Sequence, residues 1–255
     1  MYAAERRASL TTMLSRDGRV SVIDAAEELG VSGETIRRDL AVLERHGHAR
    51  RVHGGAVARA TVEAAELALA DRESRRSPEK LRIAAAAAEH LPPAGGSVVL
   101  DAGTSTAALL EHLPADRELS VITHGTVIAA MLSRLPQIDL LVVGGRVRAT
   151  TAAAVGAVTV GTYEQLRADV AFIGANGVSI ERGFTTPDFD EAAVKRAAAR
   201  AARHSIVLAD SSKIDTDYVV TFAHAGAIDM LITDDGATRE QVARLADAGL
   251  EVVIA

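Results

Sequence analysis

The spacing of hydrophobic residues changes once along the chain and divides the sequence into two parts. In residues 1–57, apolar positions recur at helical intervals, which is typical of amphipathic helices. This pattern predicts helices over residues 5–15, 25–29 and 33–45. A short basic strand over residues 48–53 follows, and Gly54-Gly55 turns the chain back toward residues 56–57.

Polar and glycine residues mark the ends of these helices. Asp24 is expected to cap the second helix, because its carboxylate can accept hydrogen bonds from the free N–H groups of the first turn. Gly30 is expected to end that helix, since glycine readily adopts the left-handed conformation found at helix ends. Ser32 is the expected cap of the third helix. Helix, glycine-containing turn and capped helix is the order of a helix-turn-helix.

From Gly95 onward, short apolar runs alternate with helical stretches. The predicted strands are residues 97–100, 120–122, 140–143, 170–173, 205–208, 230–232 and 251–254. The predicted helices are residues 79–90, 105–112, 127–135, 158–166, 190–204 and 238–248. This alternation predicts an α/β domain with a mostly parallel sheet. Since the first three strands are uninterrupted apolar runs, we expect them to be covered on both faces.

A polar segment rich in alanine and glutamate separates the two parts. The sequence therefore predicts a first domain over residues 1–57, a linker over 58–78 and a second domain over 79–255. The predicted helix at 190–204 carries Lys195, Arg196, Arg200 and Arg203, which we expect on a solvated face, with Glu191 and Lys195 as an ion pair.

Composition and charge narrow the class of protein. No apolar run approaches the ~20 residues of a membrane span, and residues 1–10 lack the apolar core of a secretory signal. We therefore expect a cytoplasmic protein that does not engage a membrane. Cysteine is absent and the histidines are scattered, so no disulfide, metal site or cofactor is expected. The net charge is −6, yet residues 1–57 alone are slightly positive, which favours nucleic acid as a partner of that part.

The third helix and the basic strand carry side chains suited to DNA. Thr35 can contact a base edge or a thymine methyl group, and Arg37 or Arg38 can bind guanine or phosphate. Asp39 would repel phosphate, so we expect it to pair with a neighbouring arginine or to orient one. The hairpin after the helix resembles a wing that reaches phosphates or the minor groove. The expected DNA-binding residues are Ser32, Thr35, Arg37, Arg38, Arg50, Arg51 and His53.

The second part contains a candidate anion site at residues 98–106, VVLDAGTST. A buried strand ends in Asp101, and Gly103 then leads into hydroxyl residues at the start of a helix, where free N–H groups attract anions. The Gly-Lys-Ser/Thr ending of a P-loop is missing, and an ordinary strand–helix turn is the alternative. Polar or glycine turns also follow later strands, and the carboxyl ends of parallel strands meet at one edge. These turns contribute Thr123, His124, Gly125, Gly144, Gly145 and Lys213.

Residues 5–57 resemble the winged helix-turn-helix of the DeoR family of bacterial repressors. The resemblance rests on VSGETIRRDL at 31–40, LERHG at 43–47 and RVHGGA at 51–56. It continues through KLRIA at 80–84, DAGTST at 101–106, VGG at 143–145, AFIGANG at 171–177, GFTTP at 183–187, EAAVK at 191–195 and DSSK at 210–213. These stretches look like the family's sensor domain, whose fold is similar to that of ribose-5-phosphate isomerase.

The resemblance implies a phosphorylated sugar or related metabolite as effector. It assigns phosphate-loop roles to Gly103, Thr104, Ser105 and Thr106, and by position it makes Asn176, Lys195 and Lys213 candidates for the rest of the ligand. Two positions depart from the family pattern. His124 stands where the family usually has asparagine, and an imidazole there would make binding sensitive to pH. Lys213 is followed by Ile-Asp rather than an aromatic residue and glycine.

Two other functions fit parts of the sequence. A sugar-phosphate isomerase with a DNA-binding appendage would need a carboxylate base, but the matching segment reads Gly174-Ala175-Asn176-Gly177. Glu181 and Asp188 are nearby, in an expected surface loop. An architectural DNA protein would leave the polar turns unexplained. The sequence thus predicts a non-enzymatic regulator that binds operator DNA as a homodimer or homotetramer, with half-sites about one DNA turn (~34 Å) apart or a multiple of that.

Overall fold

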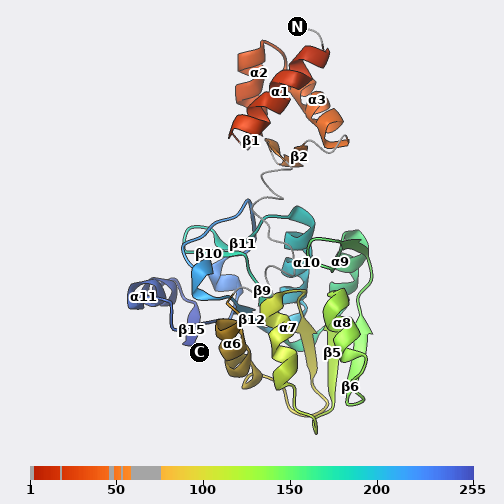
Figure 1. The fold of residues 1–255 in the computed structure, drawn as a ribbon, viewed down its shortest axis with the longest axis vertical. Helices are drawn as coiled ribbons and strands as arrows, with labels where there is room; N and C mark the ends of the chain where they lie inside the picture. Colours follow the sequence, from red (N-terminus) through yellow and green to blue (C-terminus); the bar gives the residue numbers. More distant parts are fainter. Residues whose placement is uncertain (1–2, 18, 46–48, 53, 59–75) are drawn as a thin grey trace. The chain divides into compact units, whose positions relative to one another are not determined.

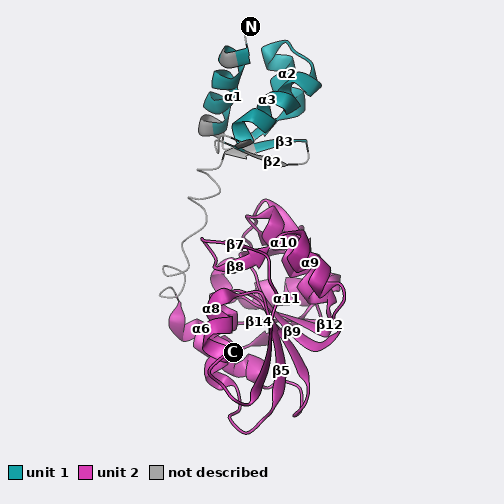
Figure 2. Ribbon diagram, turned by 90° about the vertical axis from the view of Figure 1, so that its right-hand side faces the viewer, with its two compact units in different colours: residues 1–67 teal, residues 68–255 magenta. Residues whose placement is uncertain are grey.

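The computed structural model describes residues 3–17, 19–45, 49–52, 54–58 and 76–255. The chain forms two compact units, residues 1–67 and 68–255, which are coloured separately in Figure 2. Most of the linker predicted over residues 58–78 lies outside the described residues, so its boundaries stay a prediction. Each unit is described by itself.

The first unit packs three helices on a small antiparallel sheet (Figure 1). Its elements are α1 (Ala3–Asp17), β1 (Arg19–Ser21), α2 (Val22–Leu29), α3 (Gly33–Arg45), β2 (Ala49–Val52) and β3 (Gly55–Ala58). The strands follow the order β1-β3-β2, so β3 pairs with both of the others. Leu10, Leu14, Ile36 and Leu40 are almost fully buried between the helices. These are positions at helical spacing, as the pattern predicts.

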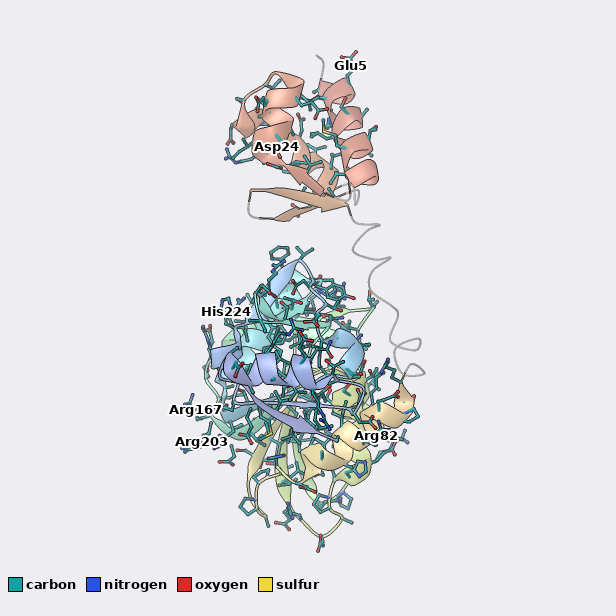
Figure 3. The ribbon with its side chains drawn as sticks, turned by 90° about the vertical axis from the view of Figure 1, so that its left-hand side faces the viewer. Glu5, Asp24, Arg82, Arg167, Arg203 and His224 are labelled. Carbon is teal, nitrogen blue, oxygen red and sulfur yellow. The ribbon has the colours of Figure 1, made fainter. Side chains whose placement is uncertain are left out.

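The predicted helix ends are correct for Gly30 and Ser32 and wrong for Asp24. Gly30 has the left-handed φ of 64°, and Ser32 Oγ accepts a hydrogen bond from Thr35 N at 3.2 Å. The second helix begins three residues earlier than predicted, at Val22, and its cap is Ser21, whose Oγ accepts from Asp24 N. Asp24 therefore lies inside the first turn of α2 (Figure 3), because Ser21 offers an oxygen one turn ahead of it.

The second unit is built around a seven-stranded sheet in the order β15-β14-β12-β9-β4-β5-β6. All six neighbouring pairs are parallel, which confirms the predicted α/β class. The strands are β4 (Ser97–Leu100), β5 (Leu119–Thr123), β6 (Ile138–Val142), β9 (Ala168–Gly174), β12 (Ala202–Leu208), β14 (Met230–Thr233) and β15 (Glu251–Ile254). Because every pair is parallel, the loops that follow these strands gather at one edge of the sheet.

Helices cover both faces of this sheet (Figure 1). One face packs against α6 (Ser77–Ala88), α7 (Thr104–Ala108), the 3-10 turn η1 (Leu109–His112) and α8 (Thr126–Leu132). The other face packs against α9 (Ala157–Tyr163), α10 (Phe189–Arg200) and α11 (Arg239–Asp247). Within the described residues, none of the helices combines the length and the apolar character needed to cross a membrane.

The prediction that the first three strands are covered on both faces is wrong for β6. β4 and β5 are largely buried, but Leu141 and Val142 of β6 are 45% and 51% exposed. β6 is the last strand of the sheet and has a neighbour on one side only. An apolar run therefore did not distinguish a central strand from an edge strand.

Several short strands have no counterpart in the sequence prediction. β7 (Arg146–Arg148) and β8 (Ala153–Val155) form an antiparallel hairpin. A second small sheet joins β10 (Gly177–Ser179), β11 (Gly183–Thr186) and β13 (Val220–Ala223). The 3-10 turns η2 (Ser211–Lys213) and η3 (Ala225–Ala227) complete the unit. Strands of three or four residues are too short to show an alternating pattern.

Candidate functional site

The outer face of α3 carries the polar residues that sequence analysis assigned to DNA. Arg37 and Arg38 are exposed, while Ile36 and Leu40 on the same helix are completely buried. Arg37 Nη1 lies 3.3 Å from Glu34 Oε2, in an exposed pair of the kind that contributes little to stability. The arginine pair is thus displayed to solvent by the packing of its own helix.

Ser32 and Thr35 form the start of α3. Besides its cap to Thr35 N, Ser32 Oγ lies 2.9 Å from Thr35 Oγ1, so the two hydroxyls are linked. The serine is exposed and the threonine half-buried at this N-terminal end. A helix N-terminus with two hydroxyls can bind phosphate or a base edge without rearranging the backbone.

Asp39 does not face solvent with the arginines beside it. It is buried, and its carboxylate pairs with Arg6 Nε of α1 at 2.5 Å, with Arg7 Nε at 3.8 Å. Asp39 does pair with arginines, but the expectation of a neighbouring arginine is wrong, because its partners come from the first helix. The carboxylate therefore joins α1 to α3 and adds no negative charge to the exposed face.

The predicted wing exists as a hairpin of β2 and β3. Arg50 is registered opposite Val57 and Arg51 opposite Ala56. The side chains of both arginines, and the whole of His53, lie outside the described residues. A Cβ atom at Gly55 would lie 2.0 Å from Val20 O, so the close pairing of β3 with β1 requires glycine there.

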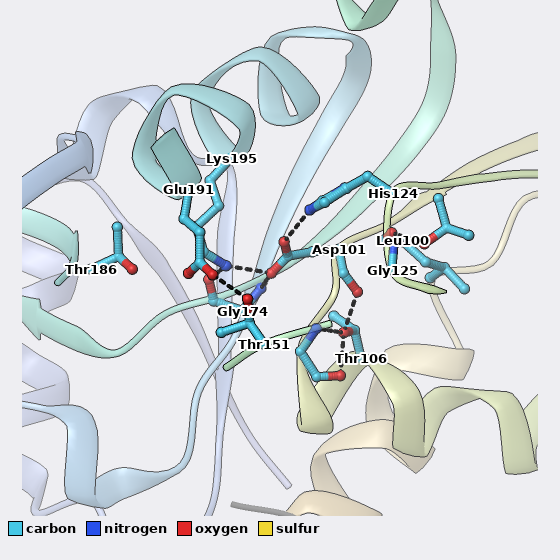
Figure 4. Close-up of polar contacts among 12 residues, drawn as sticks. Leu100, Asp101, Thr106, His124, Gly125, Thr151, Gly174, Thr186, Glu191 and Lys195 are labelled. Carbon is cyan, nitrogen blue, oxygen red and sulfur yellow. Dashed lines mark hydrogen bonds and ion pairs between the residues drawn. The ribbon is translucent and has the colours of Figure 1, made fainter. Parts of the chain in front are cut away.

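In the second unit, Asp101 is the centre of a buried polar cluster at the carboxyl edge of the sheet (Figure 4). Its Oδ2 accepts hydrogen bonds from Lys195 Nζ at 2.5 Å and Gly174 N at 2.8 Å. Its Oδ1 lies 3.3 Å from His124 Nε2. Burial by itself raises the pKa of Asp101, but the charges and hydrogen bonds of Lys195 and His124 outweigh burial and hold that pKa well below its usual range.

His124 links Asp101 to Tyr163 of α9. His124 Nδ1 lies 2.9 Å from the Tyr163 hydroxyl, and both side chains are buried. Because the ionised Asp101 can only accept, His124 Nε2 carries the proton in this contact, and Nδ1 faces the tyrosine hydroxyl. Burial, together with the negative charge of Asp101, raises the pKa of Tyr163 well above its usual value. Both ring nitrogens of His124 therefore have a partner, Asp101 at Nε2 and Tyr163 at Nδ1.

The loop after β4 closes over this cluster. Thr106 Oγ1 accepts from Gly103 N at 2.9 Å and donates to Asp101 O at 2.7 Å. In the next loop Thr123 Oγ1 donates to Leu100 O at 2.7 Å and accepts from Gly125 N at 3.1 Å. The Thr106 hydroxyl therefore holds the backbone of its own loop, and the Thr123 hydroxyl joins the loop after β5 to the end of β4.

A shallow hollow, open to solvent, lies between these loops. It is lined by Ala102, Gly103, Thr104, Ala107, Gly125, Val127, Ile128, Thr151 and Ala152. A Cβ atom at Gly125 would lie 3.0 Å from Ala102 Cα, so glycine lets the two loops approach closely. Two of the predicted loops thus share one concave surface, with the Asp101 cluster beneath Gly103.

Thr151 and Ala152 come from the β7–β8 hairpin, which sequence analysis did not foresee. Ion pairs join this hairpin to the start of α10: Arg146 to Asp190 at 2.7 Å and Arg148 to Asp188 at 3.1 Å. Arg148 also pairs with Glu191 at 3.2 Å, and the Thr151 hydroxyl donates to the same carboxylate. The expectation of a surface loop at Asp188 is wrong, because this residue is buried and caps α10 through Glu191 N.

The expected solvated face of α10 is wrong for Lys195. Its side chain is buried and donates to Asp101 and to Gly174 O at 2.9 Å. Alanines surround the charged residues in this helix, and such small side chains permit the close packing that buries a lysine. The run of alanines was the available signal for this burial. Tyr163 could have been found as a tyrosine on an apolar helix face, since a buried hydroxyl needs a partner.

The other candidate residues line the same edge of the sheet farther from Asp101. Gly144 is exposed, and its carbonyl accepts from the Thr159 hydroxyl at 2.8 Å. A Cβ atom at Gly145 would lie 2.1 Å from Thr159 Oγ1. Asn176 Oδ1 accepts from the Thr186 hydroxyl at 3.0 Å, and Lys213 ends the 3-10 turn η2 after β12.

Comparison with known proteins gives matches over nearly the whole chain. Residues 6–62 match the family model of the DeoR-like helix-turn-helix domain, and residues 75–235 match that of the DeoR C-terminal sensor domain. The chain is 35% identical to the HTH-type transcriptional regulator GlpR of Haloferax volcanii, covering 99% of this chain and 98% of that protein. It is 32% identical to the regulator GolR of Listeria innocua over the full length of both, and 27% identical to the glycerol-3-phosphate regulon repressor of Escherichia coli over 92% of both.

Solved structures give weaker matches. The sorbitol operon regulator SorC of Klebsiella pneumoniae is 14% identical, with a TM-score of 0.44 over 93% of this chain and 97% of that one. Ribose 5-phosphate isomerase A of Neisseria gonorrhoeae is 16% identical, with a TM-score of 0.40 over 54% of this chain and 53% of that one.

Proposed function

The chain belongs to the DeoR family of DNA-binding transcriptional regulators, and we propose that it represses an operon for the breakdown of a sugar or related metabolite. Its relatives are regulators rather than enzymes, so the isomerase alternative is set aside. A phosphorylated sugar bound by the second unit is the proposed signal that releases DNA. The observation that carries the proposal is the exposed Arg37–Arg38 pair on a helix whose opposite face is fully buried.

In this proposal α3 enters the major groove of the operator. Thr35, Arg37 and Arg38 contact base edges or flanking phosphates, and Ser32 holds the helix start. Arg50, Arg51 and His53 of the wing reach phosphates or the minor groove. The exposed Glu34–Arg37 pair separates readily when phosphate replaces the carboxylate, because exposed pairs are weak.

The proposed effector site is the hollow between the loops after β4 and β5. Backbone N–H groups around Gly103, with Thr104 and Ser105, bind the phosphate, while Gly125 leaves room for it. Lys195, Asn176 and Lys213, with Gly144 and Gly145 farther along the edge, bind the remainder of the sugar. Asp101, Thr106, Thr123 and His124 hold the loops in place through their internal hydrogen bonds.

Regulation follows from linkage between the two ligands. One recognition helix contributes limited affinity, so two or more chains bind half-sites, as a homodimer or homotetramer. A ligand that favours an arrangement unsuited to the half-site spacing weakens DNA binding, typically by about 1–3 kcal/mol, and DNA weakens the ligand equally. We place this activity in the cytoplasm, where a bacterial or archaeal operator is accessible.

The test separates the two binding activities. The full-length chain is screened by thermal shift against glycerol 3-phosphate, fructose 1-phosphate, ribose 5-phosphate and related sugar phosphates, since a ligand that prefers the folded state raises the melting temperature. Arg37→Ala and Arg38→Ala should abolish operator binding and retain the thermal shift. Ser105→Ala combined with Lys213→Ala should do the reverse. Loss of DNA binding in both sets, with normal circular dichroism, would contradict this division of labour.

A further inference from the structure

Arg76 joins the start of the second unit to two loops at the carboxyl edge of the sheet. It immediately precedes α6, and its Nη1 donates to Ser211 Oγ at 3.2 Å. Its Nε lies 3.7 Å from Asp210 Oδ1, and Nη1 lies 3.9 Å from Asp234 Oδ2. Glu79, one turn into α6, lies 3.7 Å from the same guanidinium. One side chain therefore contacts the loop after β12, the loop after β14 and its own helix.

The two aspartates that Arg76 contacts also shape the loop at 210–213. Asp234 accepts from Ser211 N at 2.6 Å, from Ser211 Oγ at 2.9 Å and from Gly236 N at 3.0 Å. Asp210 Oδ1 accepts from Ser212 N at 3.1 Å. Burial raises the pKa of Asp234, but the bonds from Ser211 and Gly236 and the nearby Arg76 outweigh it, so that pKa lies below its usual value. The loop is therefore held by carboxylates whose charge Arg76 balances.

The backbone of Arg76 is strained. Its φ of 52° and ψ of 38° lie in the left-handed region, which residues other than glycine rarely adopt. Such a conformation persists only where surrounding contacts over-determine it. Two kinds of contact meet at this residue: the backbone bond from Lys80 N to Arg76 O at 3.0 Å, and the side-chain contacts to Ser211, Asp210 and Asp234.

The loop at 210–213 also follows a strand that lies beside the Asp101 cluster. Leu208, at the end of β12, is registered with Gly174, whose N–H donates to Asp101. Ile214, after the loop, bridges to Val178. Lys213 therefore follows a strand that is adjacent to the Asp101 cluster, and Ser211 of the same loop contacts Arg76.

We infer that Arg76 is a positioning residue that couples effector binding at the loop 210–213 to the segment leading toward the DNA-binding unit. The inference rests on the proposed effector site. A ligand group held by Lys213 moves the loop, and Ser211 and Asp210 then release the guanidinium. The left-handed turn at Arg76 then relaxes, and the backbone at the start of α6 changes conformation. The contact thus has two states, and each ligand favours one of them.

The first experiment measures DNA affinity with and without the sugar phosphate that gives the largest thermal shift in the panel above. The DNA is a duplex that the wild-type chain selects from random sequence. Wild-type coupling is expected to be about 5–150-fold. In Arg76→Ala and Arg76→Gly the coupling should fall below about 2-fold. Both variants should bind DNA about as weakly as the ligand-bound wild type, while the thermal shift persists. Full coupling in either variant would overturn the inference.

Arg82→Ala is the matched control. Arg82 lies on the same helix (Figure 3) and pairs with Asp235, next to Asp234, at 2.6 Å. This exposed pair leaves the loop 210–213 untouched, so coupling should remain at the wild-type value. Ser211→Ala removes the hydrogen bond between Ser211 and Arg76 while leaving Arg76 in place. This variant should also reduce coupling, and it tests the contact even if the Arg76 variants fold poorly. Equal loss of coupling in Arg82→Ala would show a general effect of α6 and reject the specific role of Arg76.

A second measurement separates this inference from the proposed effector. Because linkage is reciprocal, binding of the selected duplex should change amide hydrogen exchange at residues 210–213 in the wild type, without any sugar phosphate. Arg76→Ala should lose that change, and Arg82→Ala should keep it. If no sugar phosphate acts while exchange behaves as stated, the effector proposal fails and the Arg76 link stands. If DNA leaves exchange at 210–213 unchanged in the wild type, the link itself is wrong.

Discussion

At the scale of single residues, the second unit depends on a carboxylate that is buried with its counter-charge. Asp101 is almost inaccessible, and Lys195 Nζ, Gly174 N and His124 satisfy its two oxygens. A buried charge pair of this kind adds little stability in itself, since desolvation offsets much of the attraction. Removing one partner is different, because the other charge is left in a low-dielectric environment. The main effect of the cluster is therefore to fix the positions of three loops relative to one another, and it adds little to the free energy of unfolding.

The first prediction concerns that pair. Lys195→Met should lower the free energy of unfolding by about 3–5 kcal/mol, because Asp101 stays buried without its cation. Urea denaturation followed by circular dichroism measures the loss. The double variant Asp101→Asn/Lys195→Met should recover part of it, since no uncompensated charge remains. A loss below about 1 kcal/mol in the single variant, the size of an exposed pair, would contradict the description of this cluster.

The second prediction is the pH dependence that the same carboxylate produces. The pKa of Asp101 is lower in the folded chain than its unfolded value of about 3.9. The folded state therefore holds fewer protons, and the ionised form stabilises it above that unfolded value. The contribution is lost as the pH falls below about 4 toward the folded pKa. Asp234 acts in the same direction.

Melting temperatures between about pH 6 and pH 2 measure this effect. The wild type should lose stability more steeply below pH 4 than Asp101→Asn, which has no carboxylate to protonate at this position. Parallel curves for the two proteins would mean that Asp101 titrates normally. Asp169→Asn is a useful comparison, because its pKa is also lowered, by hydrogen bonds from Ser97, but at a more exposed position.

At the scale of elements, the sequence predicted what depends on local periodicity. The three helices of the first unit, the seven strands of the large sheet and the covering helices all follow from apolar spacing. Their ends differ from prediction by a few residues, as in α2, where Ser21 and Asp24, three positions apart, could each act as the cap. The β7–β8 hairpin was missed because its strands have three residues each and depend on ion pairs with α10.

In the candidate site, too, the sequence predicted local features and missed contacts between distant segments. Glycine and hydroxyl residues after strands identified the loops that meet at the carboxyl edge, including Gly103 and Gly125. Contacts between distant segments were not visible, so Lys195 was expected both on a solvated face and near the ligand, and Tyr163 was not considered. The spacing of residues along a helix predicts which of them lie on one face. Which segment packs against that face depends on the tertiary fold, and the spacing does not show it.

The third prediction tests the close pairing of β3 with β1, which depends on glycine at position 55. Gly55→Ala should destabilise the first unit and weaken DNA binding, because its Cβ would lie 2.0 Å from Val20 O and would separate β3 from β1. Gly54→Ala is the matched neighbour. Its φ of 84° is also unfavourable for alanine, by about 1 kcal/mol, but no atom lies within 4 Å of the added Cβ. Gly55→Ala should therefore have the larger effect on melting and on affinity for DNA at low salt.

At the scale of the whole molecule, DNA recognition and effector binding belong to units with separate cores. The first unit buries Leu10, Leu14, Ile36 and Leu40 around α3, and none of these residues belongs to the clusters that cover the large sheet. The connecting chain and the arrangement of several copies are two routes by which a signal can pass between the units. The proposed role of Arg76 concerns the connecting chain, and the spacing of operator half-sites concerns the arrangement of several copies.

The fourth prediction follows from that second route. If two copies of the chain bind one operator, their recognition helices must meet successive major grooves on the same side of the duplex, one turn or a multiple apart. Inserting about 5 base pairs between the half-sites turns one of them to the opposite side, so affinity should fall toward that of a single half-site. Inserting about 10 restores the facing and should recover much of the loss. Arg38→Ala should abolish binding to all three duplexes, because it removes a contact from every copy rather than altering their spacing. Equal affinity for the three duplexes would mean that each chain binds DNA independently, and effector release would then have to act within a single chain.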